Sequence, residues 1–207
     1  LLQMSSLPQA QGLESLMECV ASLIEEAERS LEQHNAQAQI PGATTVLVAL
    51  LYGAKDAAHP YSHWVYGYLG DGDIVLMSPG RRIKNWPAET WLLTPHKLGD
   101  QPVLLPRSTT MKEFRPLVGC IPYHPGDILY AATDGISFIN QFLRRKEKLT
   151  FGQYLWRESF TKTPENNGNA AATGMHLPNP AEQFGVEGLT IFDDVCVGVI
   201  WTEVNHG

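Results

Sequence analysis

The sequence has no long apolar run, few cysteines and no concentrated block of positive charge. Its most apolar run, residues 44–51, is far shorter than the roughly 20 residues that a membrane-spanning helix needs. No basic segment followed by an apolar one opens the chain, so no secretory signal is visible. We therefore expect a soluble, cytoplasmic protein without a membrane partner.

The scarcity of cysteine and of clustered positive charge excludes further classes. Cys19, Cys120 and Cys196 are too few and too scattered for a disulfide framework or a zinc site. The formal net charge is −7 and the basic runs are short, whereas nucleic-acid binding needs clustered Lys and Arg to neutralise phosphates. Nucleic acid is therefore not expected as a main partner.

Motifs of several enzyme classes are missing as well. No Gly-x-Ser-x-Gly segment offers a serine nucleophile, and neither a Walker loop nor Gly-x-Gly-x-x-Gly opens a helix. Cys120 lacks the following arginine with which cysteine-based phosphatases bind phosphate. If the chain is an enzyme, its catalytic residues must lie elsewhere.

What the chain does contain is the pattern of one α+β domain spanning residues 1–207, a length suited to a single core. Apolar residues at helical spacing predict a helix over 12–34, and helices are also expected over 137–145 and 150–159. Strands are expected at 43–51, 64–69, 74–77, 127–132 and 195–201, with short strands and loops over 79–120. The Asp71-Gly72 turn predicts that 64–69 and 74–77 form a hairpin. Residues 1–11 read as an irregular lead-in and 161–188 as a long loop.

Four aspartates occur where an apolar strand begins or ends: Asp71, Asp134, Asp193 and Asp194. A carboxylate held at a strand end is rigid yet reaches water, which suits hard ions such as Mg²⁺ and Mn²⁺ that prefer oxygen ligands. Each aspartate also has a simpler reading, because Asp-Gly is a favoured turn and Asp193-Asp194 would fit a solvated loop. Spacing along the chain does not show whether these side chains converge.

Segments of the chain resemble, in order, the type 2C metal-dependent serine/threonine protein phosphatases. They are Gly-Ala-Thr-Thr at 42–45, Leu-Gly-Asp-Gly-Asp-Ile-Val at 69–75, the run from Gly126 to Gly135 that ends in Thr-Asp-Gly, and Asp-Asp-Val-Cys-Val at 193–197. The Gly-Asp-Gly form, together with residues 89–94, is most similar to a bacterial subgroup. The resemblance covers roughly residues 12–201.

The resemblance implies two packed antiparallel β-sheets flanked by helices, an α-β-β-α sandwich. It implies that Asp134 and Asp193 are ligands of one Mg²⁺ or Mn²⁺ ion in a two-ion centre, with Asp71 serving a third, more weakly held ion. The activity implied is hydrolysis of phosphoserine and phosphothreonine in a phosphorylated protein by metal-activated water, without a covalent nucleophile. Within residues 79–120, Arg81, Arg82 and Lys84 are expected to shape substrate access.

The chain also departs from the family's pattern. The family opens with strands that carry an Asp-Gly metal motif, whereas the first aspartate here is Asp56. We therefore expect those N-terminal strands to be missing from this sequence. If the full-length protein lacks the motif, the alternative is an inactive pseudophosphatase that acts as a regulatory or binding module. A plain structural domain with ordinary Asp-Gly turns is a third reading, and it predicts that Asp71, Asp134 and Asp193 lie far apart.

Overall fold

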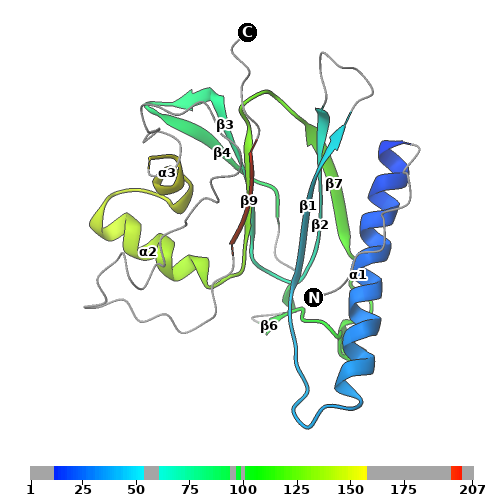
Figure 1. The fold of residues 1–207 in the computed structure, drawn as a ribbon. Helices are drawn as coiled ribbons and strands as arrows, with labels where there is room; N and C mark the ends of the chain where they lie inside the picture. Colours follow the sequence, from blue (N-terminus) through cyan, green and yellow to red (C-terminus); the bar gives the residue numbers. More distant parts are fainter. Residues whose placement is uncertain (1–11, 54–60, 94–96, 99–100, 158–196, 202–207) are drawn as a thin grey trace, which may run out of the picture.

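The computed structural model describes residues 12–53, 61–93, 97–98, 101–157 and 197–201. The predicted lead-in at 1–11 and loop at 161–188 lie outside these residues. The elements, shown in Figure 1, are the helices α1 (Leu13–Asn35), α2 (Ile136–Lys146) and α3 (Phe151–Leu155), a 3₁₀ turn at Thr109–Met111, and the strands β1 (Val46–Gly53), β2 (Tyr61–Leu69), β3 (Asp73–Ile83), β4 (Trp86–Trp91), β5 (Lys97–Leu98), β6 (Gln101–Pro102), β7 (Leu117–Pro122), β8 (Ile128–Ala132) and β9 (Val197–Trp201).

The longer strands form two antiparallel sheets. One has the order β1-β2-β7 and the other β4-β3-β8-β9, while β5 and β6 pair by themselves. Every strand pair among the described residues is antiparallel. Helix α1 covers the outer face of the first sheet, and α2 and α3 cover the outer face of the second (Figure 1). The α+β class and the helix-flanked pair of sheets predicted from the sequence are therefore confirmed.

Alternation along the strands explains why the layers stack in this way. On β3, Ile74 and Leu76 face the other sheet, whereas Val75 and Met77 pack under α2 and α3. Successive side chains of a strand point to opposite faces, and here both faces are apolar. On β2, Trp64 and Tyr68 likewise enter the core between the sheets. A strand that is apolar on both faces is stable only with a layer on each side, which gives four layers.

The predicted hairpin across the Asp71-Gly72 turn is wrong. Strand β2 pairs with β1 and β7, and β3 pairs with β4 and β8, so the turn carries the chain from one sheet to the other. The Asp-Gly signal identified a tight turn correctly. It did not identify the partner of each strand, because two runs that are buried on both faces gain more by entering separate stacked sheets than by pairing.

The helices are close to their predicted positions. Helix α1 is amphipathic and buries Val20 and Ile24 against the first sheet. Helix α3 is shorter than predicted and begins at a capping box, in which the Thr150 hydroxyl accepts from the Gln153 amide N–H and the Gln153 side chain accepts from the Thr150 amide N–H. No helix in the described part of the chain combines the length and apolarity needed to cross a membrane.

A buried ion pair ties α1 to the segment that leads into β7. The side chains of Glu28 and Arg107 are each 9% exposed. Arg107 Nε donates to Glu28 Oε1 at 3.0 Å and to Oε2 at 3.1 Å, and the Arg107 amide N–H donates to Oε1 at 2.7 Å. Arg107 Nη2 also donates to Glu28, and Nη1 donates to the Phe114 carbonyl. One helix residue therefore fixes both the backbone and the side chain of this segment.

Candidate metal-binding edge

The Gly70-Asp71-Gly72 turn between β2 and β3 is built for close packing. Gly70 has φ +114° and Gly72 has φ +130°, a region that favours glycine. A Cβ on Gly70 would lie 2.5 Å from Thr45 Cγ2, and one on Gly72 would lie 2.6 Å from the Ala132 carbonyl oxygen. The two glycines thus allow the turn to press against its neighbours, and Asp71 between them is only 6% exposed.

Replacing Gly72 by Ala is expected to destabilise the protein by at least about 2 kcal/mol, because the backbone strain and the collision with the Ala132 carbonyl add. Thermal unfolding would show the loss as a lower Tm. The matched control is Gly80→Ala on β3, the strand that follows this turn, since a Cβ on Gly80 would meet no atom within 4 Å. Equal Tm values for Gly72→Ala and the wild type would contradict the turn geometry.

The Thr133-Asp134-Gly135 segment lies against this turn at the same edge of the second sheet. It follows β8 directly and leads into α2, with the Ser137 amide N–H donating to the Asp134 carbonyl at 2.9 Å. Asp73 pairs with Ala132 across the β3–β8 ladder. A Cβ on Gly72 would lie 3.6 Å from Thr133 Cα. The two Asp-Gly turns, about sixty residues apart in the sequence, are therefore neighbours in space.

Asp73 is a third carboxylate at this edge, and the sequence analysis did not select it. Burial raises the pKa of Asp73, and the negative charge of Asp134 raises it further. That electrostatic effect shows that the two carboxylates lie near each other. The sequence feature that could have selected Asp73 is its position directly after Gly-Asp-Gly, as the first residue of β3.

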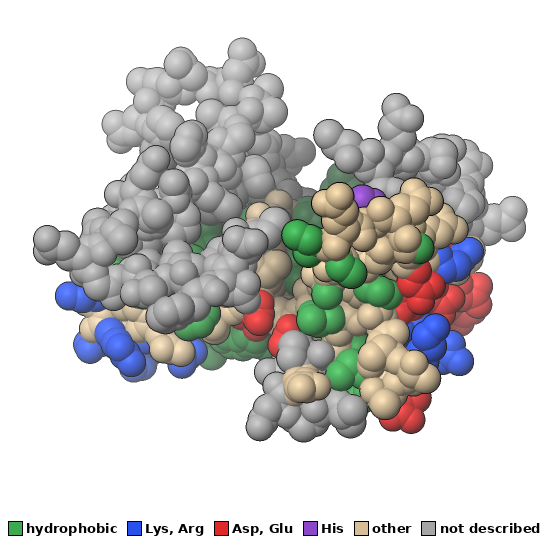
Figure 2. All heavy atoms as spheres, turned by 90° about the horizontal axis from the view of Figure 1, so that it is seen from below, with side chains coloured by type: hydrophobic (Ala, Val, Ile, Leu, Met, Phe, Trp, Pro, Cys, Tyr) green, Lys and Arg blue, Asp and Glu red, His purple; other side chains and the backbone are tan. Residues whose placement is uncertain are grey.

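The Gly42-Ala43-Thr44-Thr45 segment completes the edge. Thr44 pairs with Leu105 through two backbone hydrogen bonds of 2.9 and 2.7 Å, and Thr45 lies under Gly70. Three of the four segments noted in the sequence therefore meet at one place. Figure 2 views the molecule from this end and shows acidic side chains near the middle of the face.

The predicted ligands are thus only partly located. Asp71 is buried and Asp134 is exposed at the shared edge, while Asp193 and Asp194 lie outside the described residues. Within the described ranges, no group of three or more His, Cys, Asp or Glu side chains is arranged to hold a metal ion. The ligand set given by the resemblance remains a prediction.

The residues predicted to shape substrate access lie elsewhere. Arg81 and Arg82 belong to the far part of β3, and Lys84 follows that strand. Arg81 is eight positions beyond Asp73, which along a strand corresponds to roughly 25 Å. The structure therefore does not bring these cations to the edge that holds Asp71 and Asp134.

A hollow of about 300 Å³ does border that edge. It is lined by residues of β3, β4 and α2, namely Asp73, Trp91, Ser137, Asn140, Gln141 and Arg144. Trp91 is 46% exposed, so the hollow combines an accessible aromatic ring, a cation and polar side chains.

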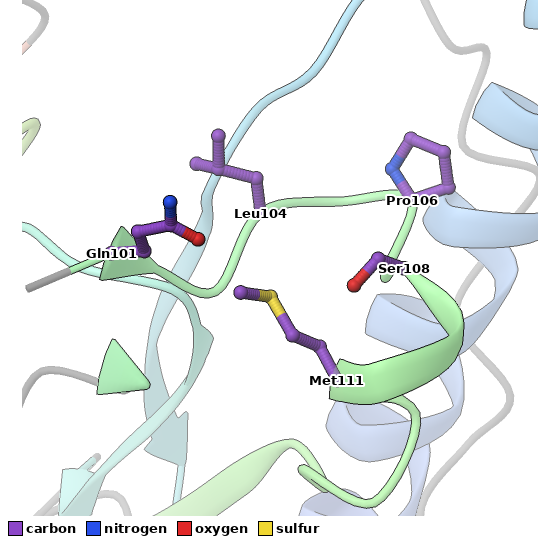
Figure 3. A pocket seen from close by; sticks show the side chains of 5 residues that line it. All are labelled: Gln101, Leu104, Pro106, Ser108 and Met111. Carbon is purple, nitrogen blue, oxygen red and sulfur yellow. The ribbon is translucent and has the colours of Figure 1, made fainter. Parts of the chain in front are cut away.

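A second, larger hollow of about 410 Å³ lies beside the 3₁₀ turn, where Figure 3 shows Gln101, Ser108 and Met111 directed into the space between them. None of its lining residues is charged.

Comparison with known proteins gives no family assignment by sequence. No protein-family model matches the chain, and no curated protein matches it. Among solved structures it is similar to the photosystem II phosphatase PBCP, with 18% identity, a TM-score of 0.39, and coverage of 70% of this chain and 48% of that one. It is also similar to the phosphatase domain of the cell fate determinant SpoIIE from Bacillus subtilis, with 16% identity, a TM-score of 0.36, and coverage of 98% of this chain and 79% of that one. A manganese-presoaked structure of that domain gives the same identity and TM-score.

The chain spans about half the length of the photosystem II phosphatase. Structural similarities with TM-scores of 0.39 and 0.36 do not support an inference about activity. The functional assignment therefore rests on the residues and geometry of the edge itself.

Proposed function

We propose that the chain is a metal-dependent phosphatase that hydrolyses phosphoserine and phosphothreonine in proteins. The observation that carries the proposal is the meeting of residues 42–45, 70–73 and 132–134 at one sheet edge. In the sequence these segments resemble successive parts of the type 2C phosphatases. The plain structural reading predicted that Asp71 and Asp134 lie far apart, whereas their turns are neighbours, which supports the functional reading of both residues.

In this proposal, Asp134 and Asp193 hold one Mg²⁺ or Mn²⁺ ion of a two-ion centre, and Asp71 serves a third ion beside it. The donor chemistry fits, because carboxylate oxygens are the ligands that hard divalent ions prefer. The carboxylates of Asp73 and Asp134 also repel each other across the edge, and a cation there would relieve that repulsion. When bound, the ions would activate water for attack on phosphorus and stabilise negative charge on the phosphoryl oxygens.

The substrate would approach along the hollow between β4 and α2. Trp91 offers an exposed ring for the apolar part of a peptide, and Arg144 offers a cation for an acidic or phosphorylated side chain. Asp73 lines the same hollow, so a peptide lying there would reach the carboxylate edge. This path is distinct from the access route expected through Arg81, Arg82 and Lys84, which stays a prediction.

The test is phosphate release from a phosphothreonine peptide by the full-length protein, measured with Mn²⁺ and again with EDTA. We expect turnover with Mn²⁺ and none with EDTA. A preparation that is folded by circular dichroism but releases no phosphate in Mn²⁺ would contradict the enzymatic assignment. If such a preparation still binds the phosphopeptide, the pseudophosphatase alternative becomes the better account.

A further inference from the structure

A third hollow, of about 330 Å³, lies at the opposite end of the second sheet from Asp71 and Asp134. Its lining comes from the far part of β3 and from the turn before β8, namely Ser78, Gly80, Arg81, His124, Pro125 and Asp127. In Figure 1 the β3–β4 hairpin and the β7–β8 connection lie at the upper end of the molecule, whereas the β8–α2 connection lies at the lower end. The hollow is therefore separate from the proposed metal edge.

One wall of the hollow is a bulge in β3. Ser78 pairs with Ala88 and Arg82 pairs with Pro87, so Pro79, Gly80 and Arg81 have no counterpart on β4. Bulges bend a strand and redirect its side chains, and they are common beside functional sites. Here the bulge brings the exposed Arg81 to the rim of the hollow. Pro79 has no N–H to leave unpaired there.

The other wall is a turn fixed by a buried carboxylate. Asp127 is 2% exposed, and its Oδ2 accepts from the His124 amide N–H at 3.0 Å. The Asp127 amide N–H donates back to the His124 carbonyl at 3.0 Å. His124 Nδ1 lies 3.5 Å from the same Asp127 oxygen, while the imidazole is 62% exposed. The Nδ1 side of the ring therefore faces Asp127, and Nε2 lies on the side of the ring farther from that carboxylate.

Ser78 supplies a hydroxyl that bonds to no described residue. The residue is 5% exposed, and its Oγ is buried without a hydrogen-bond partner in the described part of the chain. A buried polar group left unpaired costs about 1–3 kcal/mol. A change of the Ser78 side-chain rotamer that turns the hydroxyl toward a ligand in the hollow would recover part of that cost. Ser78, Arg81 and His124 can all donate, and the one acidic residue, Asp127, is already engaged by His124.

We propose that this hollow binds a phosphoryl group, either as free phosphate or on a phosphorylated side chain. Donors on three residues of two different segments match the several terminal oxygens of a phosphoryl group, whereas a carboxylate has only two oxygens to offer. Arg81 provides the positive charge, in a guanidinium geometry that suits phosphate. The site does not depend on the metal edge or on its proposed activity.

The test is titration of the full-length protein in EDTA with inorganic phosphate, followed by nuclear magnetic resonance. Because EDTA removes divalent ions, failure of this site is distinguishable from failure of the phosphatase assignment. Arg81→Gln is expected to weaken phosphate binding about tenfold or more. The neighbouring Arg82→Gln removes the same charge from an exposed residue that does not line the hollow, and its phosphate affinity is expected to match the wild type.

Ser78→Ala is a second test, in which stability and phosphate affinity are expected to respond differently. Removing a buried, unpaired hydroxyl is expected to leave Tm unchanged or raised, while phosphate binding weakens severalfold. A merely structural role for Ser78 would not change phosphate affinity.

Parallel titrations separate the sources of the group. Tighter binding of a phosphothreonine peptide than of phosphate, if Arg81→Gln weakens it, identifies a phosphorylated protein. Binding of phosphate alone, weakened in the same way, identifies the free anion, and either result supports the site. Acetate binding as tightly as phosphate would overturn the phosphoryl assignment. Equal weakening by Arg81→Gln and Arg82→Gln, or no saturable phosphate binding by the wild type, would overturn the site.

Discussion

Asp134→Ala is expected to lower manganese-dependent hydrolysis of a phosphothreonine peptide by at least about a hundredfold. Asp134 lies at the end of β8, beside the Gly70-Asp71-Gly72 turn and close to Asp73. Because it is exposed, its loss removes a proposed ion ligand without opening the core. The variant should therefore keep a Tm close to that of the wild type while losing turnover, and the two measurements together separate a site residue from a structural one.

The control for this variant removes one negative charge elsewhere. Glu18 is exposed on α1, the outer helix of the other sheet. Glu18→Gln is expected to hydrolyse the peptide at the wild-type rate. If Asp134→Ala retains turnover as well, the carboxylate edge is not the reaction centre.

Breaking the Glu28–Arg107 pair is expected to be the most destabilising of the single changes considered. Glu28→Ala leaves the Arg107 guanidinium buried without its carboxylate and leaves the Arg107 amide N–H without its acceptor. Removing one partner of a buried ion pair costs about 3–5 kcal/mol. Urea unfolding would measure the loss. The double replacement Glu28→Leu with Arg107→Met should recover much of it, because no unpaired buried charge remains.

The same pair predicts how stability depends on pH. Hydrogen bonds from Arg107 hold the pKa of Glu28 below its ordinary value of 4.5, against the opposing effect of burial. A lowered pKa in the folded state stabilises the protein fully above pH 4.5, and this contribution is lost as the pH falls through the folded-state pKa. The stability difference between the wild type and Glu28→Gln should therefore shrink in acid. A constant difference from pH 7 to pH 3 would contradict the pair.

Much of the fold could be predicted from local patterns. The spacing of Val20 and Ile24 predicted α1, and the apolar runs around Ile74 and Leu129 predicted β3 and β8. The pairing of strands could not be predicted in the same way. Taken with its neighbouring residues alone, the Asp71-Gly72 turn predicts a hairpin. The strands β2 and β3 instead lie in different sheets, because both faces of each strand are buried.

The site shows the same division between local and long-range information. Asp71 and Asp134 were selected because each follows a strand, and the structure brings their turns together. Asp73 was missed because its importance comes from its partner across the β3–β8 ladder, and the sequence does not give that register. Arg81 is expected to shape substrate access as part of residues 79–120, but the length of β3 places it at the far end of that strand from Asp73.

The most direct test of the carboxylate edge is the affinity for Mn²⁺, measured by titration calorimetry on the full-length protein and on Asp71→Asn, Asp134→Asn and Glu18→Gln. Asparagine keeps the size of each side chain and removes its charge. If the two turns form one ion-binding edge, Asp134→Asn should weaken Mn²⁺ binding about tenfold or more, Asp71→Asn should weaken it less, and Glu18→Gln should bind as the wild type does. Unchanged Mn²⁺ affinity in Asp134→Asn would contradict the proposed metal site.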